Sequence, residues 1–272
     1  MLPKHNAAHT KESHIIPSQS KTTITIAQLS DCHLFADVNR EHHGVNVFNT
    51  LNRVLADIAS RPEIDCIVFT GDLTQDHTEL SYKRFSQAVR DNNISTPVYF
   101  LAGNHDEETL LNRYLANAPF VQNKTIHFLN WQVQLLNSKS ETPAGNVCSD
   151  TLDLLANSID STKQQLLMMH HHPVNVGYFI DKHGLENKAD FWQAVKALPN
   201  IQGIACGHVH RASKINKGTE MAEQCVDVYT CPATSIQFDP LADTVKALDK
   251  SPGYRLFYLP QNGTMSSDVI WC

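Results

Sequence analysis

Five short polar motifs, each directly after an apolar stretch, carry side chains that can bind metal ions or transfer protons. In chain order they are Asp31-x-His33, Gly71-Asp72, Gly103-Asn104-His105-Asp106, His170-His171-His172-Pro173 and Gly207-His208-x-His210. A glycine at the end of a strand lets the backbone turn sharply and approach a ligand. Because the active sites of open α/β sheets lie outside the carboxyl ends of the strands, we expect the five motifs to meet at one edge.

The donor groups of these motifs indicate a centre with two metal ions. They include more carboxylate, amide and imidazole groups than one ion can use, and about as many as two ions need. Mixed nitrogen and oxygen donors without cysteine favour Fe, Mn, Zn or Co over Mg or Ca. Ion pairs about 3.5–4 Å apart, which a shared carboxylate can bridge, serve displacement at phosphorus. Core histidines and strand-end caps would explain any one motif, but not five at the same kind of position.

The apolar stretches before the motifs predict buried strands. These strands are expected over residues 23–29, 66–70, 98–101, 165–169 and 201–206. Apolar residues at helical spacing predict helices over residues 47–60 and around 80–89, so the first half alternates strand and helix and favours a parallel sheet. From an extended chain, at most two of the three consecutive histidines can share a face.

The other segments carry no catalytic signal of their own. We expect a helix near residues 107–117, a strand pair over 125–129 and 131–136, and a helix over 149–159 capped by Ser149 or Thr151. Closing strands are expected over 223–231 and 254–259, and the polar loop between them, with residues 232–235 and 239–240, is placed to border the site.

Composition excludes several classes of protein. The chain has 272 residues and a net charge of -6, and it lacks a run of Lys and Arg, which argues against binding a nucleic-acid polymer. We find neither an apolar stretch of about 20 residues for a membrane span nor an apolar secretory segment. Seven cysteines without a framework spacing, with Cys66 and Cys206 in predicted strands, favour reduced thiols in a cytoplasmic protein. We expect a flexible tail over residues 1–21 and a single domain over 22–272.

In this order, the five motifs resemble those of the calcineurin-like metallophosphoesterase superfamily, and the resemblance runs from about residue 23 to the C-terminus. Further stretches are similar to the bacterial class III 3',5'-cyclic-AMP phosphodiesterases. These are residues 34–37 (LFAD), 44–46 (GVN), 71–76 (GDLTQD), 170–173 (HHHP) and 231–238 (CPATSIQF). The resemblance implies a four-layer αββα sandwich of the metallophosphoesterase type, with a two-metal site at the C-terminal ends of the strands.

The resemblance also implies a ligand set. It assigns the first ion to Asp31, His33, Asp72 and His210, and the second ion to Asp72, Asn104, His171 and His208, with Asp72 as the bridge. His171 is chosen from the triplet because of the family's His-x-Pro spacing, which leaves His170 in the strand and His172 behind the ligands. The implied ions are Fe and/or Mn, with Zn or Co as alternatives.

The implied reaction is the hydrolysis of 3',5'-cyclic AMP to 5'-AMP by attack of a bridging hydroxide, with His105 assisting the leaving group. The alternative is another phosphodiesterase or a phosphomonoesterase of the superfamily, acting on a 2',3'-cyclic nucleotide, a glycerophosphodiester or a nucleotide pyrophosphate. A degenerate scaffold that only binds a protein partner should lack ligands or the catalytic histidine, and this chain retains them. Whether the protein is a monomer or a homodimer stays open.

Substrate contacts are expected from Asn104 and His105, and also from Asn46 and Asn187. The region around Phe238 is a candidate apolar wall for the adenine.

The chain departs from the family pattern at one position. Many relatives place an aspartate three residues after the bridging aspartate, where it orients the catalytic histidine, but this chain has Gln75 there. Either Asp76 or Asp106 takes that role, or His105 is held by neutral hydrogen bonds alone.

Overall fold

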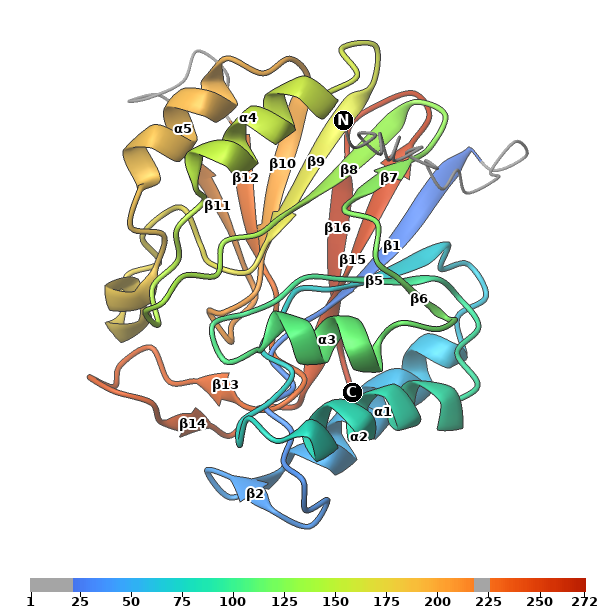
Figure 1. Cartoon of the computed structure of the whole chain (residues 1–272), viewed down its shortest axis with the longest axis vertical. Coiled ribbons are helices and arrows are strands. Elements are labelled where there is room, and N and C mark those ends of the chain that lie inside the picture. Colours follow the sequence, from blue (N-terminus) through green and yellow to red (C-terminus); the bar gives the residue numbers. More distant parts are fainter. Residues whose placement is uncertain (1–21, 218–225) are drawn as a thin grey trace, which may run out of the picture.

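Two facing β-sheets lie between two layers of helices in the computed structural model, which describes residues 22–217 and 226–272 (Figure 1). The first sheet contains, in spatial order, β16 (Ser266–Trp271), β15 (Gly253–Pro260), β1 (Thr23–Leu29), β4 (Cys66–Phe69), β5 (Val98–Phe100) and β6 (Phe120–Val121). The second contains β11 (Ser213–Lys217), β12 (Val226–Thr230), β10 (Ile201–Cys206), β9 (Gln164–Met169), β8 (Trp131–Leu136) and β7 (Thr125–His127). The predicted four-layer αββα sandwich is confirmed.

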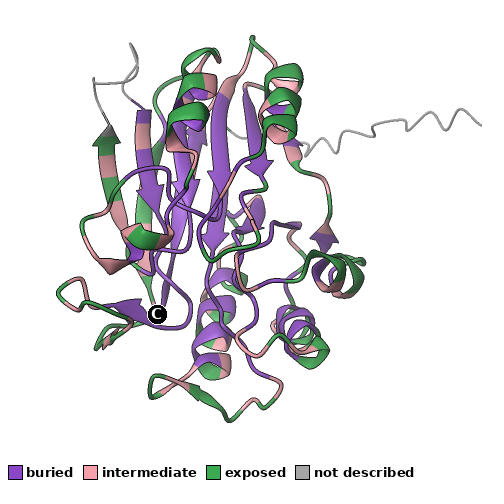
Figure 2. Ribbon diagram, turned by 60° about the vertical axis from the view of Figure 1, so that its left-hand side comes forward, coloured by how far each residue is buried: buried purple, intermediate pink, exposed green. Residues whose placement is uncertain are grey.

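Both faces of the central strands are buried, which explains why the sequence shows continuous apolar runs there (Figure 2). In β1, Ile24 and Ile26 point into the core between the two sheets, whereas Ala27 and Leu29 point toward the helices of the first sheet. The other ligand-bearing strands follow the same rule, because successive side chains of a strand point to opposite faces. The continuous apolar stretches of the sequence therefore identify the strands that precede the predicted ligands.

Helices cover the outer face of each sheet. α1 (Val47–Ala59), α2 (Glu79–Asp91) and α3 (Glu108–Tyr114) cover the first sheet, and α4 (Ser149–Ser158) and α5 (Lys188–Lys196) cover the second (Figure 1). The cap predicted for α4 is wrong: Cys148 is the N-cap residue, with extended backbone, and neither Ser149 nor Thr151 takes that position. None of the described helices is both long and apolar enough to cross a membrane.

Several short elements were not predicted. The hairpin of β13 (Gln237–Phe238) and β14 (Ala247–Leu248), the hairpin of β2 (Glu41–His42) and β3 (Val45–Asn46), and the 3-10 helix η1 (Phe179–His183) carry no periodic pattern. The edge strands β6, β11 and β16 were also missed. The predicted tail over residues 1–21 lies outside the described residues, as do residues 223–225 of the predicted closing strand.

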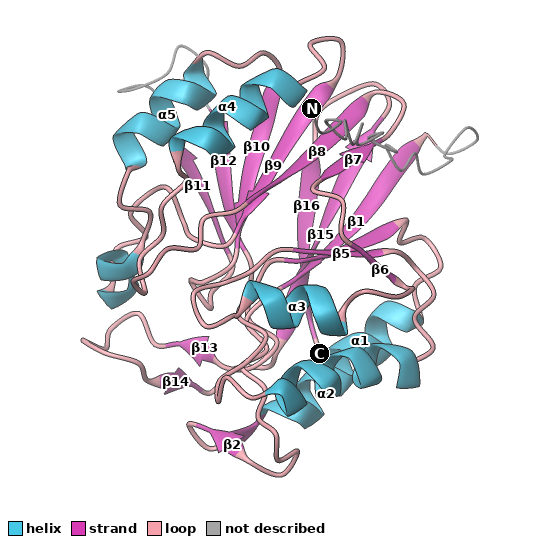
Figure 3. Ribbon diagram, in the orientation of Figure 1, coloured by secondary structure: helices cyan, strands magenta, loops and turns pink. Residues whose placement is uncertain are grey.

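The parallel strands bring their carboxyl ends to one edge of the sandwich (Figure 3). β1, β4 and β5 are parallel neighbours in the first sheet, and β9 and β10 are parallel neighbours in the second. The five motifs follow these five strands, so the loops from both sheets meet at this edge, as the sequence predicts.

Candidate metal centre and active site

The loops that follow the strands hold five of the predicted ligands in the left-handed backbone region. The φ angles are 59° at Asp31, 48° at His33, 58° at Asp72, 65° at His208 and 50° at His210. Only a few per cent of residues other than glycine adopt this region, and such residues cluster at active sites. The packed sheets hold these turns, which aim the side chains at one another.

Glycines allow the loops after β4 and β5 to touch. A Cβ atom on Gly103 would lie 2.2 Å from Asp72 Oδ1, and one on Gly71 would lie 2.4 Å from the backbone nitrogen of Gly103. The close approach lets the His105 N–H donate to Asp72 Oδ1 at 2.9 Å. The position of the predicted bridging carboxylate thus depends on the absence of these two side chains.

The first ligand group contains two imidazoles that face each other. His33 Nε2 and His210 Nε2 are 2.9 Å apart. His33 Nδ1 lies 2.8 Å from the side-chain oxygen of Gln75, and His210 Nδ1 lies 2.8 Å from the Ile236 carbonyl oxygen. Because these oxygens can only accept, each ring carries its proton on Nδ1, and burial lowers the pKa of His33. The Nε2 atoms of both rings therefore face the same place, with Asp31 Oδ1 only 3.4 Å from His210 Nε2, and a cation fits there.

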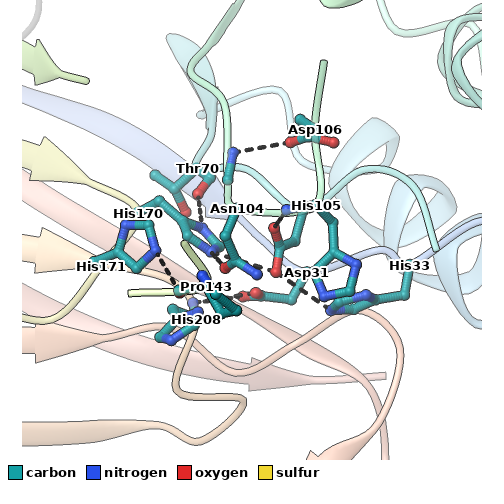
Figure 4. A network of polar contacts seen from close by, with 12 residues as sticks. Asp31, His33, Thr70, Asn104, His105, Asp106, Pro143, His170, His171 and His208 are labelled. Atoms are coloured by element: carbon teal, nitrogen blue, oxygen red, sulfur yellow. Dashed lines mark hydrogen bonds and ion pairs between the residues drawn. The ribbon is translucent and has the colours of Figure 1, made fainter. Parts of the chain in front are cut away.

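The second ligand group surrounds His208. Ring nitrogens of His170, His171 and His208 lie within 4.8 Å of one another (Figure 4). His208 Nε2 is buried and has no hydrogen-bond partner among the described residues. Burial and the neighbouring imidazoles lower the pKa of His208, so this ring is a neutral donor. A buried ring nitrogen without a hydrogen-bond partner is suited to bind a metal ion, and the residues present fit a second ion.

His170 does not lie in the strand as predicted, because β9 ends at Met169. Its ring points into the site, where Nδ1 donates to the Thr70 carbonyl oxygen at 2.7 Å. Nε2 lies 3.1 Å from Asn104 Oδ1 and 3.4 Å from Asp72 Oδ2. Burial lowers the pKa of His170. The negative charge of Asp72 and its hydrogen bond to the ring act in the opposite direction, and the net result is a pKa raised to about 9. His170 is therefore a buried hydrogen-bond donor to two of the predicted ligands.

The remaining two residues of the triplet also contact His208. The ring centroids of His171 and His172 lie 4.8 and 5.6 Å from that of His208, because the triplet follows the strand end and is not extended. His171 Nδ1 is 2.9 Å from the Ser138 hydroxyl, which orients its ring. His172 Nε2 contacts Asp181 at 3.2 Å, behind the ligand group.

A cavity of about 490 Å³ opens above the two ligand groups. The predicted residues that line it are His33, Asp72, Asn104, His105, His208, His210 and Phe238. The remaining wall comes from the loop at Pro143, from η1 and from the β13–β14 hairpin. Its residues are Pro143, Phe179, Ile180, Lys182, His183, Asp243, Thr244 and Val245. The sequence pointed to this wall through Phe238, through the polar loop at 239–240 and through the loop after the His-His-Pro motif, which contains His183. The other wall residues were missed, because their loops have no periodicity.

His105 lines the cavity beside the first ligand group. Its ring lies 4.9 Å from the His33 ring, and its Nδ1 is buried without a hydrogen-bond partner among the described residues. Burial lowers the pKa of His105, which keeps the imidazole neutral near pH 7. Its position at the cavity surface suits transfer of a proton to a bound substrate.

Neither nearby aspartate orients His105. Asp106 accepts backbone N–H groups of Leu73 and Gly103, each at 2.9 Å, and Asp76 accepts the Ala36 N–H at 2.7 Å. Gln75, the departure from the family pattern, bonds His33 instead. Of the three possibilities that the sequence leaves open, the structure favours a histidine whose ring is held without a carboxylate, although its backbone N–H donates to Asp72.

Asn46 and Asn187 have other partners. Asn46 is the N-cap of α1, where its side-chain oxygen accepts the Asn49 N–H at 2.9 Å. Both ends of the Asn187 amide bond the backbone of Val147. Neither residue lines the cavity.

A family model described as Calcineurin-like phosphoesterase matches residues 24–212. The chain belongs to the calcineurin-like phosphoesterase family. A probable cyclic nucleotide phosphodiesterase of Colwellia psychrerythraea is 52% identical over 93% of this chain and 97% of that protein. The 3',5'-cyclic adenosine monophosphate phosphodiesterase CpdA of Vibrio vulnificus is 30% identical over 92% of this chain and 90% of that protein.

Solved structures share the fold of this phosphoesterase. A dimetal phosphatase from Danio rerio superimposes with a TM-score of 0.56 at 12% identity, over 90% of this chain and 98% of that one. A purple acid phosphatase from yellow lupin gives 0.59 at 13% identity, over 92% of this chain and 54% of that one. The protein is thus a hydrolase of a family that uses divalent metal ions, and its His and Asp groups are suited to bind them.

Proposed function

We propose that this phosphoesterase hydrolyses 3',5'-cyclic AMP to 5'-AMP at a two-metal centre in the cytoplasm. The observation that carries the proposal is the floor of the cavity, where His33 Nε2 and His210 Nε2 face each other 2.9 Å apart and His208 Nε2 lacks a partner among the described residues. The names of the relatives from Colwellia and Vibrio support a cyclic nucleotide as the substrate.

Two neighbouring ligand groups would hold the ions. The first consists of Asp31, His33, Asp72 and His210, and the second of Asp72, Asn104, His171 and His208. Fe and/or Mn suit this donor set, with Zn or Co as alternatives. When bound, the ions would activate water and neutralise charge on the phosphoryl oxygens. Asp72 Oδ2 lies 3.7 Å from His33 Nε2 of the first group, and His170 Nε2 lies both 3.4 Å from Asp72 and 3.1 Å from Asn104 Oδ1 of the second group, which supports the assignment of Asp72 as the bridge.

His105 would act on the leaving oxygen. A neutral imidazole still carries one N–H, which can donate a hydrogen bond to O3' of the substrate. The negative phosphodiester would also raise the pKa of the imidazole, because a nearby opposite charge favours the protonated ring. His105 and Asn104, which both line the cavity, are thus placed to contact the phosphoryl group.

The far wall of the cavity offers an apolar surface to the base. The Phe238 ring stacks on His210 with centroids 3.9 Å apart, and Phe179 lies 5.2 Å from Phe238. Ile180 lines the cavity beside them. A purine can bury part of its face on such a wall, while its phosphate reaches the ligand groups. Lys182, at the same wall, supplies positive charge for an anionic substrate.

The test is hydrolysis of 3',5'-cyclic AMP by protein reconstituted with Mn or Fe, beside 2',3'-cyclic AMP and bis-p-nitrophenyl phosphate. We expect 5'-AMP as the product and loss of activity on chelation. His105→Ala should keep its metal but lose about 10²–10⁴-fold in rate, the usual contribution of a positioned acid. His127→Ala, in β7 at the edge of the second sheet, is the matched control. Activity on bis-p-nitrophenyl phosphate without activity on 3',5'-cyclic AMP would overturn the assignment of 3',5'-cyclic AMP as the substrate.

A further inference from the structure

A second histidine, outside the predicted ligand set, lies against His105. His77 Nδ1 donates to the backbone carbonyl oxygen of His105 at 2.9 Å. The two rings are stacked, with centroids 5.7 Å apart and planes within 8° of parallel. His77 therefore contacts both the backbone and the side chain of the residue that we assign to the leaving group. None of the five motifs contains it.

The side chain of His105 has few other contacts that could orient it. Its side-chain Nδ1 has no hydrogen-bond partner among the described residues, and the carboxylates of Asp76 and Asp106 are bonded to other backbone groups. Gln75 is engaged with His33. The ring stacking of His77, together with the edge contact of His33, confines the plane of the His105 ring.

The turn that carries His77 is rigidly built. His77 has a φ angle of 56°, in the left-handed region, and its own N–H donates to the Thr74 hydroxyl at 3.0 Å. Asp76 secures the turn on both sides, because it accepts the Ala36 N–H and the Thr78 hydroxyl, each at 2.7 Å. A residue other than glycine in this backbone region costs free energy, and such strain concentrates where a side chain must be aimed.

We propose that His77 is a positioning residue for His105, whose ring nitrogen has no carboxylate partner among the described residues. The hydrogen bond fixes the backbone of His105, and the stacked ring holds its imidazole in the plane from which the N–H reaches the leaving oxygen. This inference rests on the role of His105 in the proposed function. His77 itself does not line the cavity, so it acts only through His105.

The test compares diesters that differ in their need for a proton. The alkoxide that leaves 3',5'-cyclic AMP needs proton donation, whereas p-nitrophenolate leaves bis-p-nitrophenyl phosphate without it. His77→Ala should lower kcat on cyclic AMP roughly tenfold, about the effect of one net hydrogen bond, with KM unchanged. The same variant should change kcat on bis-p-nitrophenyl phosphate less than twofold. His77→Asn should recover only part of the loss, because Asn tolerates the left-handed region and can donate to the same carbonyl oxygen but has no ring to stack on His105.

A double-mutant cycle completes the test. If His77 acts through His105, His77→Ala added to His105→Ala should cause no further loss on cyclic AMP. The proposal would be overturned if the effects of His77→Ala and His105→Ala on the rate with cyclic AMP multiplied in the double mutant. It would also be overturned if His77→Ala and His77→Asn each lost as much activity on bis-p-nitrophenyl phosphate as on cyclic AMP. Metal content and thermal unfolding of each variant, with His127→Ala as the control, reveal a merely structural defect. If the wild type does not hydrolyse cyclic AMP, the proposed function fails, and glycerophosphoethanolamine, which also releases an alkoxide, tests His77 separately.

Discussion

Asp106 provides a quantitative test of how the loops after β4 and β5 are held together. Its side chain is fully buried, and it accepts the backbone N–H groups of Leu73 and Gly103 at 2.9 Å and that of Thr74 at 3.4 Å. The two short bonds join the segment that follows Asp72 to the segment that precedes His105. Asp106→Ala would leave both N–H groups buried without a partner.

The size of the effect follows from these two bonds. A hydrogen bond to a charged group is worth about 1.5–3 kcal/mol, so two of them give about 3–6 kcal/mol. Burial and the Asp72 carboxylate raise the pKa of Asp106 to about 7, so at neutral pH the bonds are only partly charge-assisted. We therefore expect Asp106→Ala to lower the free energy of unfolding by about 3–4 kcal/mol. Asp106→Asn keeps one carbonyl oxygen and should lose about half as much.

Urea unfolding at pH 7, with chelator and with saturating metal, measures this change. Asp249→Ala, an exposed aspartate in the loop after β14, is the matched control and should stay within about 0.5 kcal/mol of wild type. The hydrolysis rate should also fall in Asp106→Ala, since the same bonds place Asn104 and His105. A variant whose stability in chelator lies within 1 kcal/mol of wild type would refute the assignment of Asp106 as the residue that joins the two loops.

Two further predictions concern the metal centre and the acid side of the stability profile. Asp72→Ala should lose ions from both ligand groups, because it removes the carboxylate between them; elemental analysis that still finds two ions per chain would contradict a bridging role. Burial alone would raise the pKa of Asp181. The hydrogen bonds from His172 and from the backbone N–H groups of Val176 and Gly177 have the larger, opposite effect and lower this pKa to about 2. Because the pKa of Asp181 is lower in the folded than in the unfolded protein, its ionised carboxylate stabilises the fold above pH 4, and this stabilisation is lost as the pH falls toward 2. Asp181→Asn should therefore lower the free energy of unfolding by about 1–2 kcal/mol at pH 5–7, a value that allows for the partial exposure of the side chain. In urea unfolding the difference from wild type should shrink below pH 4; a constant difference would count against this account.

The sequence contained enough to place the ligand-bearing strands, because strands buried on both faces leave unmistakable apolar runs. Cys66–Phe69 and Ile201–Cys206 are examples, each followed by glycine and a ligand. Parallel strands bring their carboxyl ends together, so the position of Asp72 and His208 at one edge follows from the order of the elements.

The cavity wall could not be predicted in the same way. η1 and the β13–β14 hairpin are short, and their conformations depend on tertiary contacts such as the hydrogen bond from the Phe238 N–H to the His210 carbonyl oxygen at 3.1 Å. The inward direction of His170 was missed for a related reason. An alternation rule applies to extended chain, and the chain turns immediately after Met169. The contact of His77 depends on a left-handed turn that its residue type permits but does not specify.

The position of β1 has a consequence for how the protein is made. β1 lies between β4 and β15, and β15 follows every predicted ligand in the chain. During synthesis, the strand that precedes Asp31 and His33 therefore keeps one unpaired edge until β15 has been made. We expect the first ligand group to reach its final geometry only when β15 pairs with β1. Tight binding of an ion by this group would then be a property of the folded domain and not of a shorter nascent chain.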